Sequence, residues 1–71
     1  MKREAVVSSS IRTIGYDEGP GNLEVEFANG EVYRYKNVPL DVFSSLKAAA
    51  SKGSFFNAHI RGHFPFEKVH A

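Results

Sequence analysis

The chain contains no cysteine and no tryptophan, and its runs of consecutive apolar residues are only a few residues long. Without cysteine there is no disulfide, no thiolate ligand for a metal and no cysteine nucleophile. Without a long apolar run there is neither a candidate transmembrane helix nor a signal peptide. These absences exclude a disulfide-stabilised secreted domain and a membrane-spanning helix, so we expect a cytoplasmic protein with no membrane partner.

The chain also lacks an excess of charge of one sign. It contains 9 Lys and Arg residues and 8 Asp and Glu residues, which give a formal net charge of +1 at pH 7. A strongly basic balance is typical of nucleic-acid-binding domains, so this balance neither requires nor excludes a nucleic-acid partner. The 71 residues predict one domain over 1–71, with an ordered core at about 6–69. A domain of this size without disulfides has little stability to spare, and we expect a monomer or a weak homodimer.

An alternating segment at 23–35, interrupted by an Asn-Gly pair, predicts a β-hairpin. A two-residue loop would mix the apolar residues of the first strand with basic residues of the second. A three-residue loop instead places five side chains on one apolar face: Leu23, Val25, Phe27, Tyr33 and Tyr35. It also sets Glu24 opposite Arg34 on the other face. We therefore predict a three-residue loop at 28–30, closed by Gly30 at positive φ as a bulge residue.

Two further segments extend this hairpin into a sheet. Residues 11–16 are rich in β-branched and aromatic side chains, which predicts a strand whose imperfect alternation reflects a bulge near Arg12 or Thr13. A loop of turn residues follows, and another extended segment is expected at 5–7. The predicted sheet is a three-stranded antiparallel meander with residues 22–27 in its centre.

After the hairpin, apolar residues recur every three or four positions, which predicts an amphipathic helix over 39–52. Pro39 is expected at its first helical position and Asp41 in its first turn, and Gly53 is expected to end it. Its apolar stripe consists of Leu40, Phe43, Leu46, Ala49 and Ala50. We expect this stripe to pack against the sheet.

A second, short helix is predicted over 55–61, with Ser54 as its N-cap and Gly62 ending it. Residues 63–69 return to an extended form that Pro65 keeps out of a central strand, so they form a tail over the core or an edge strand. The predicted fold class is α+β. It consists of a three-stranded antiparallel β-meander packed against one amphipathic helix, followed by the short second helix and an extended C-terminal tail.

His59, His63 and Glu67 are spaced four apart, a spacing that suits metal ligands on one helix. Gly62 and Pro65 oppose a continuous helix there and cysteine is absent, so surface or capping histidines are the better interpretation. No segment has the form of a nucleophile elbow or of a glycine-rich phosphate loop followed by a helix. We therefore predict no metal site, no cofactor and no catalytic residue.

Aromatic and basic side chains alternate at 33–36 and mix again in the last third of the chain. Tyrosines on a strand can stack on bases while neighbouring Arg and Lys side chains bind phosphates. Structural roles compete with these. The tyrosines can lie in the core with their hydroxyls reaching water, Arg34 can pair with Glu24, Arg61 can bind the carbonyls at a helix end, and Asn57 can bridge backbone groups. The candidate nucleic-acid-binding residues are Tyr33, Arg34, Tyr35, Lys36, Arg61 and Arg12.

Two motifs carry a resemblance. Tyr-Arg-Tyr stands at 33–35, and Ser-Lys-Gly-Ser-Phe-Phe-Asn stands at 51–57, followed by Ile60 and Arg61. Over about residues 8–69 the chain resembles the KTSC domain family. This family is named after the carboxy-terminal extension of some lysyl-tRNA synthetases, and many of its bacterial members are short stand-alone proteins. The resemblance implies a domain of unestablished function, and the synthetase connection points to RNA or tRNA. The family signature falls on Tyr33, Tyr35, Phe55, Phe56, Asn57, Ile60 and Arg61, of which Phe55, Phe56, Asn57 and Ile60 are also explained as a folding motif.

Three hypotheses for function remain open. The first is a non-catalytic RNA-binding module in which Arg34, Lys36, Arg61 and Arg12 bind phosphates. Scatter of these basic groups over different faces, or an RNA affinity that does not depend on salt, would exclude this module. The second is a protein-interaction or self-associating module that uses a sheet edge or an aromatic patch of Phe64 and Phe66, and monomeric behaviour at high concentration would exclude self-association. The third is a small enzyme, which needs a concave pocket with converging polar groups.

Overall fold

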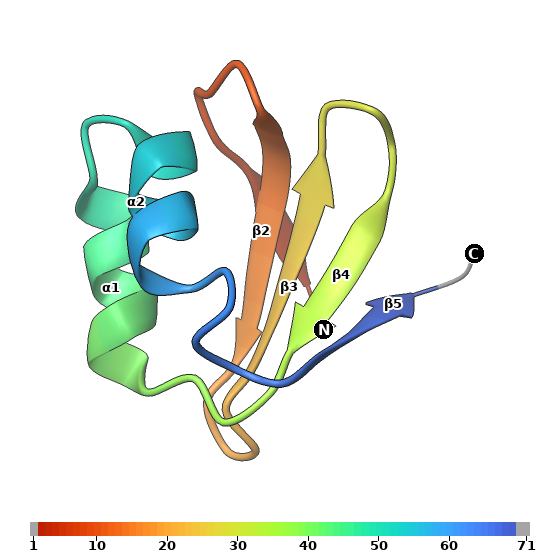
Figure 1. The fold of residues 1–71 in the computed structure, drawn as a ribbon, viewed down its shortest axis with the longest axis vertical. Coiled ribbons are helices and arrows are strands. Elements are labelled where there is room, and N and C mark those ends of the chain that lie inside the picture. Colours follow the sequence, from red (N-terminus) through yellow and green to blue (C-terminus); the bar gives the residue numbers. More distant parts are fainter. Residues whose placement is uncertain (1, 70–71) are drawn as a thin grey trace.

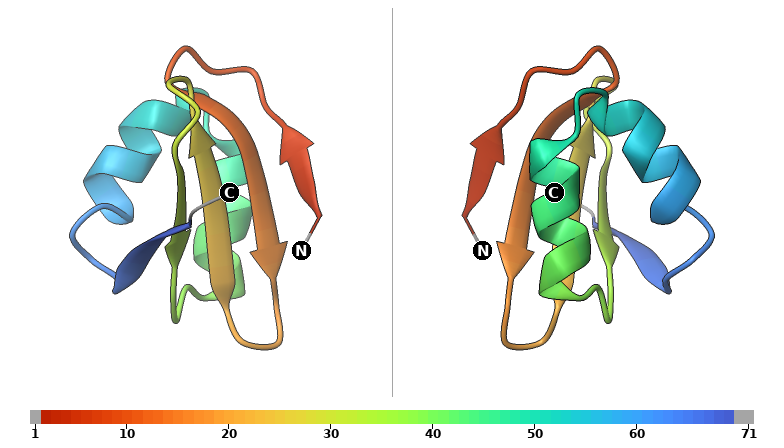
Figure 2. Two further views of the ribbon diagram at one scale, coloured as in Figure 1. Left: turned by 90° about the vertical axis from the view of Figure 1, so that its right-hand side faces the viewer. Right: turned by 90° about the vertical axis from the view of Figure 1, so that its left-hand side faces the viewer.

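A sheet and a pair of helices that cover one of its faces form the molecule (Figure 1, Figure 2). The structure is a computed structural model that describes residues 2–69. The strands in this range pair antiparallel in the order β1-β2-β3-β4-β5, and both helices lie between β4 and β5 in the chain. Neither helix of the described range is long and apolar enough to cross a membrane. The elements are β1 (Arg3–Ala5), β2 (Ile11–Asp17), β3 (Asn22–Phe27), β4 (Val32–Tyr35), α1 (Leu40–Ala48), α2 (Lys52–His59) and β5 (Phe66–Val69).

The hairpin of β3 and β4 has the predicted register. Leu23 pairs with Tyr35 and Glu24 pairs with Arg34. The Gly30 amide donates to the Phe27 carbonyl at 2.9 Å, and Gly30 has a φ of 90°, a conformation that glycine adopts without a steric penalty. The three-residue loop is therefore confirmed. The predicted bulge in β2 is confirmed as well, since the pairing of β2 with β3 shifts register between residues 11 and 13.

The predicted three-stranded meander is the centre of a wider sheet. A short strand, β1, pairs with β2, and the predicted tail is an edge strand, β5, that pairs with β4. The prediction of only three strands was wrong because both added strands consist largely of exposed or charged residues, so apolar alternation does not reveal them. Pro65 directly precedes β5, and its carbonyl accepts from the Lys36 amide at 2.8 Å.

The helices begin and end at other residues than predicted. Helix α1 ends at Ala48, and the chain turns to extended backbone at Ala49 instead of continuing to Lys52. Helix α2 then begins with Ser51 as its N-cap, whose hydroxyl accepts from the Ser54 amide at 3.3 Å. Gly53, predicted to end the first helix, lies in the first turn of α2 instead. A Cβ there would come within 2.3 Å of the hydroxyl oxygen of Ser10, so the glycine allows the two segments to approach.

Pro39 is the N-cap of α1, with a φ of −66° and a ψ of 153°, and not its first helical residue as predicted. The predicted apolar stripe is also less buried than expected, because Leu46 alone is fully buried in α1 and Leu40 is 46% exposed. The α2 residue Phe56 and its C-cap Ile60 complete the core. The buried apolar residues of the described range are Ile11, Ile14, Leu23, Val25, Tyr35, Val38, Leu46, Phe56 and Ile60.

Candidate nucleic-acid interface

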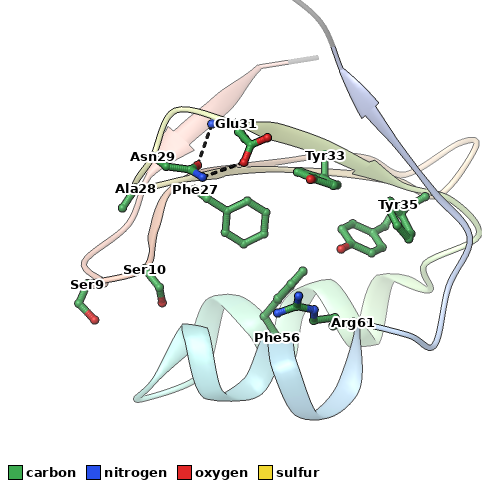
Figure 3. Close-up of a pocket in the computed structure, with 11 residues that line it drawn as sticks. Ser9, Ser10, Phe27, Ala28, Asn29, Glu31, Tyr33, Tyr35, Phe56 and Arg61 are labelled. Atoms are coloured by element: carbon green, nitrogen blue, oxygen red, sulfur yellow. Dashed lines mark hydrogen bonds between the residues drawn. The ribbon is translucent and has the colours of Figure 1, made fainter.

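An open groove of about 630 Å³ lies on the helix-covered side of the sheet, between the β3–β4 hairpin and α2 (Figure 3). We call it the aromatic groove. Five aromatic side chains and one arginine line it, together with small and polar residues of the 8–10 and 28–31 loops. The lining residues are Ser9, Ser10, Phe27, Ala28, Asn29, Glu31, Tyr33, Tyr35, Phe56, Arg61 and Phe66.

The five rings of the groove form one continuous cluster. Phe27 meets both Tyr33 and Phe56 edge-on, with ring centroids 5.7 and 5.3 Å apart. The ring of Phe66 lies tilted over Tyr33 and Tyr35, at 5.7 and 5.3 Å. Edge-on and tilted contacts at these distances are favourable for aromatic pairs. The cluster therefore has fixed inner rings and one outer ring, since Phe56 is 2% exposed and Phe66 is 56% exposed.

Arg61 follows the end of α2 and supplies the positive charge of the groove. Its amide donates to the Phe56 carbonyl at 2.9 Å, which fixes its backbone. Its exposed side chain lines the groove and, within residues 2–69, makes neither a hydrogen bond nor an ion pair. Burial raises the pKa of Tyr35, and the nearby positive charge of Arg61 opposes that shift. Arg61 and Tyr35 thus line the same groove.

Glu31 is the carboxylate of the groove, and it is already paired. Lys68 contacts it in an ion pair. Asn29 donates to it at 2.8 Å (Figure 3). The hydrogen bond from Lys68 is the main cause that lowers the pKa of Glu31, and the bond from Asn29 adds to it. Glu31 is consequently ionised at neutral pH, and its charge is balanced by its neighbour on β5.

The open face of the sheet carries charges instead of rings. One row across all five strands, which we call the ion-pair row, consists of Arg3, Gly15, Glu24, Arg34 and Glu67. The Glu24 carboxylate accepts from Arg34 at 2.8 and 3.1 Å and lies 3.7 Å from Arg3. Glu67 lies 3.7 Å from Arg34 and 2.7 Å from Lys36. Arg3 reaches across β2 to Glu24 because Gly15 has no side chain, and a Cβ at Gly15 would lie only 2.7 Å from the Arg3 Cγ.

The structure divides the six candidate residues between these two faces. Tyr33, Tyr35 and Arg61 meet in the aromatic groove. Arg34 and Lys36 lie on the open face, where each is paired with a carboxylate. The predicted pairing of Arg34 with Glu24 is confirmed. The six residues do not form one surface, so an RNA-binding face built from all of these basic groups is excluded.

Arg12 belongs to the open-face group as well. Its guanidinium donates to the Ala28 carbonyl at 2.9 Å and lies 3.6 Å from the Glu26 carboxylate. Of the signature residues, Phe56 and Ile60 are core, Phe55 is half-buried against His59, and Asn57 is exposed. Arg61 makes no side-chain bond to the carbonyls at the helix end in the described range, in contrast to its predicted structural role.

Sequence reasoning missed Phe27 and Phe66 as parts of the site. Phe27 was assigned to the apolar face of the hairpin, and Phe66 only to an exposed patch. Pro65 was the signal that could have located Phe66, because it indicates an edge strand that begins after it. Pairing of this strand with β4 sets Phe66 opposite Tyr35, on the face of the groove. Within residues 2–69 no group of three His, Asp or Glu side chains is placed to hold a metal ion.

A five-stranded antiparallel sheet with two helices on one face, within residues 2–69, defines a small α+β domain with a groove at its hairpin. The family model of the KTSC domain matches residues 7–64, so the chain belongs to the KTSC domain family. This confirms the resemblance drawn from the sequence motifs.

Relatives of the chain occur alone and within a larger protein. It is 51% identical over 57 residues to an uncharacterised protein of Stutzerimonas stutzeri, covering 80% of each chain. It is 41% identical over 61 residues to a lysine–tRNA ligase of Nostoc punctiforme, covering 86% of this chain and 11% of that protein. A crystal structure of a KTSC domain protein from Yersinia pestis matches with a TM-score of 0.95, 38% identity and 97% coverage of both chains. The fold is thus shared with a solved member of the family.

Proposed function

We propose that this KTSC domain is a non-catalytic module that binds single-stranded RNA in the aromatic groove. The observation that carries the proposal is the groove itself, in which an outer ring, Phe66, and the cation of Arg61, unpaired within residues 2–69, line the same hollow as Tyr35. Unpaired bases stack on aromatic side chains, and each such contact contributes about 1–3 kcal/mol. A volume of about 630 Å³ is in the range of small-ligand sites.

The pairing of the basic side chains favours the groove, and not the open face, as the surface that contacts RNA. A cation that is already paired with a carboxylate binds a phosphate more weakly than an unpaired cation does. Arg34, Lys36 and Arg12 are paired on the open face, whereas Arg61 is not paired within the described residues. The proposal therefore keeps Tyr33, Tyr35 and Arg61 from the predicted set and adds Phe66.

RNA is favoured as the partner by the relatives. One of them is a lysine–tRNA ligase, a protein that by its name acts on a tRNA. Single-stranded loops and ends of RNA expose the base faces that an aromatic groove can stack against. A tRNA-like RNA in the cytoplasm is thus the partner that the proposal names.

Catalysis is disfavoured by the state of Glu31. A general base works best when its pKa lies near the working pH. The pKa of Glu31 is lowered by the hydrogen bonds from Lys68 and Asn29, so this carboxylate is a weak base and is not available to a substrate. A binding role agrees better with these contacts.

The experiment is a nitrogen–proton NMR titration of the full chain with a single-stranded RNA and with an RNA duplex of the same composition. We expect the single strand to shift the amides of Tyr33, Tyr35, Phe66 and Arg61, with smaller shifts from the duplex. Shifts centred on Arg34 would place the contact on the open face and contradict the proposal. Unmoved spectra would exclude RNA, and shifts that depend on protein concentration without RNA would indicate self-association through β5.

A further inference from the structure

We infer that the RNA is held mainly by base stacking and that Arg61 makes the single phosphate contact of the aromatic groove. This inference rests on the proposed function. Its ligand class is a short unpaired stretch of RNA in which one base stacks on Phe66 while a neighbouring phosphate meets Arg61. It differs from the usual picture of a small RNA-binding domain, in which a row of basic side chains follows the phosphates.

The number of available cations limits the number of phosphate contacts. The other cation beside the groove, Lys68, is bound by Glu31. Lys52 lies at the start of α2, in a neighbouring hollow that shares Ser9 and Ser10 with the groove, and its ammonium group donates to the Ala49 carbonyl at 3.1 Å. Among the described residues, Arg61 is therefore the groove-lining cation that no acceptor holds.

Tyr35 lies in the groove with both Phe66, on which a base would stack, and the cation of Arg61. The Tyr35 ring lies 5.3 Å from the ring of Phe66. Phe66 is 56% exposed, so one side of its ring is open to a base. A base on Phe66 and a phosphate at Arg61 would thus bind in the same groove, which suits neighbouring groups of one strand. Bases stacked within a duplex do not offer an open face to Phe66.

A single phosphate contact has a measurable consequence in the salt dependence of binding. For a single strand, the logarithm of affinity falls with the logarithm of salt with a slope of about −0.7 per phosphate contact. One contact therefore predicts a loss of about 2.6-fold between about 50 mM and about 200 mM salt. Contacts from Arg12, Arg34, Lys36 and Arg61 together would predict a loss of about 50-fold over the same range.

The experiment measures the binding of a fluorescein-labelled hexaadenylate RNA to the full chain by anisotropy at both salt concentrations. Arg61→Gln is compared with Lys47→Gln, a charge-matched control whose ammonium pairs with Glu4 at 3.0 Å, outside the groove. We expect Arg61→Gln to weaken binding roughly ten-fold at low salt and to remove the salt dependence. Lys47→Gln should stay within about two-fold of the unaltered chain, since exposed pairs contribute little.

A second pair of variants separates stacking from charge. Phe66→Leu keeps an apolar side chain without the ring, and we expect it to lose at least about five-fold in affinity while the salt slope stays. Arg61→Lys should keep the slope. Equal effects of Arg61→Gln and Lys47→Gln, or a loss near 50-fold between the two salt concentrations in the unaltered chain, would overturn the single-contact inference while RNA binding stands. No binding at either salt concentration would instead remove the proposed function itself.

Discussion

The two faces of the sheet are held together by different interactions: ion pairs on the open face and aromatic contacts on the face that the helices cover. On the open face, the ion-pair row satisfies its charges internally, and Glu24 in its centre is only 9% exposed. On the covered face, rings pack on rings, and the outermost of them, Phe66, remains half in solvent. The same two strands, β3 and β4, supply both faces by alternation. Interleaved aromatic and basic residues on a strand are therefore separated in space, because neighbours in sequence point to opposite sides.

The largest effect is expected from breaking the covered face at Phe56. This ring contacts both Phe27 and Tyr35 and is 2% exposed. Phe56→Ala should lower the free energy of unfolding by about 3–5 kcal/mol, which is enough to leave much of a domain this small unfolded. Thermal and urea denaturation followed by circular dichroism measure it. Phe55→Ala is the control, because Phe55 is half-buried against His59, and an equal loss in both variants would contradict a core centred on Phe56.

The second-largest loss of stability is expected from a substitution of Glu24 on the open face. Glu24→Gln keeps the shape of the side chain but removes the charge that Arg34 and Arg3 share. Because the site is buried, we expect a loss of about 1–2 kcal/mol in the free energy of unfolding. Urea denaturation gives the value, with Glu18→Gln in the exposed loop before β3 as a control of equal charge change. A loss in Glu24→Gln no larger than that of the control would show that the row contributes nothing to stability.

Gly15 offers a more local test of the ion-pair row. A Cβ at this position would lie 2.7 Å from the Arg3 Cγ and 3.0 Å from the Lys2 carbonyl oxygen, so β1 must shift away. Gly15→Ala should lower the free energy of unfolding by about 1 kcal/mol. Amide hydrogen exchange should quicken in β1 and not in β4. Slower or unchanged exchange in β1 would mean that the edge strand adapts without losing its pairing.

The smallest effect concerns pH at the rim shared by both faces. Glu31 and Glu67 have lowered pKa values, caused first by hydrogen bonds from Lys68 and Lys36. A carboxylate whose pKa is lowered by folding stabilises the fold above its ordinary value near 4.5, and that contribution is lost as pH falls through the folded-state pKa. The melting temperature should therefore decline below about pH 4.5. The decline should be shallower in the double variant Glu31→Gln, Glu67→Gln, and an unchanged pH profile would contradict the role of these pairs.

The sequence predicted the central hairpin well because two signals agreed there. Apolar alternation and the turn residues at 28–30 allow one register that keeps an apolar face together. The break between the helices could not be predicted in this way. Ala49 and Ala50 favour a helix, but Ser51 caps α2, and Gly53 lies where an added Cβ would meet Ser10, a residue far away in sequence.

The candidate site was predicted only in part. Tyr33, Tyr35 and Arg61 were recognised, and their meeting in one groove depends on α2 folding back over the hairpin. Phe66 was not included because it joins the groove only through the pairing of β5 with β4. Arg34 and Lys36 were included for their proximity in sequence to the tyrosines, although the predicted register already set Arg34 on the opposite face of the sheet.

The charged edge strand β5 has a consequence for how the protein behaves in crowded solution. An antiparallel partner strand from a second copy, continuing the same sheet faces, would set Glu67 against Glu67 or Lys68 against Lys68 in its central registers. A register centred on Phe66 would bring in Pro65, which has no amide to donate. Like charges and a missing donor discourage sheets from joining edge to edge. The edge strand that borders the groove is therefore a poor template for an added strand.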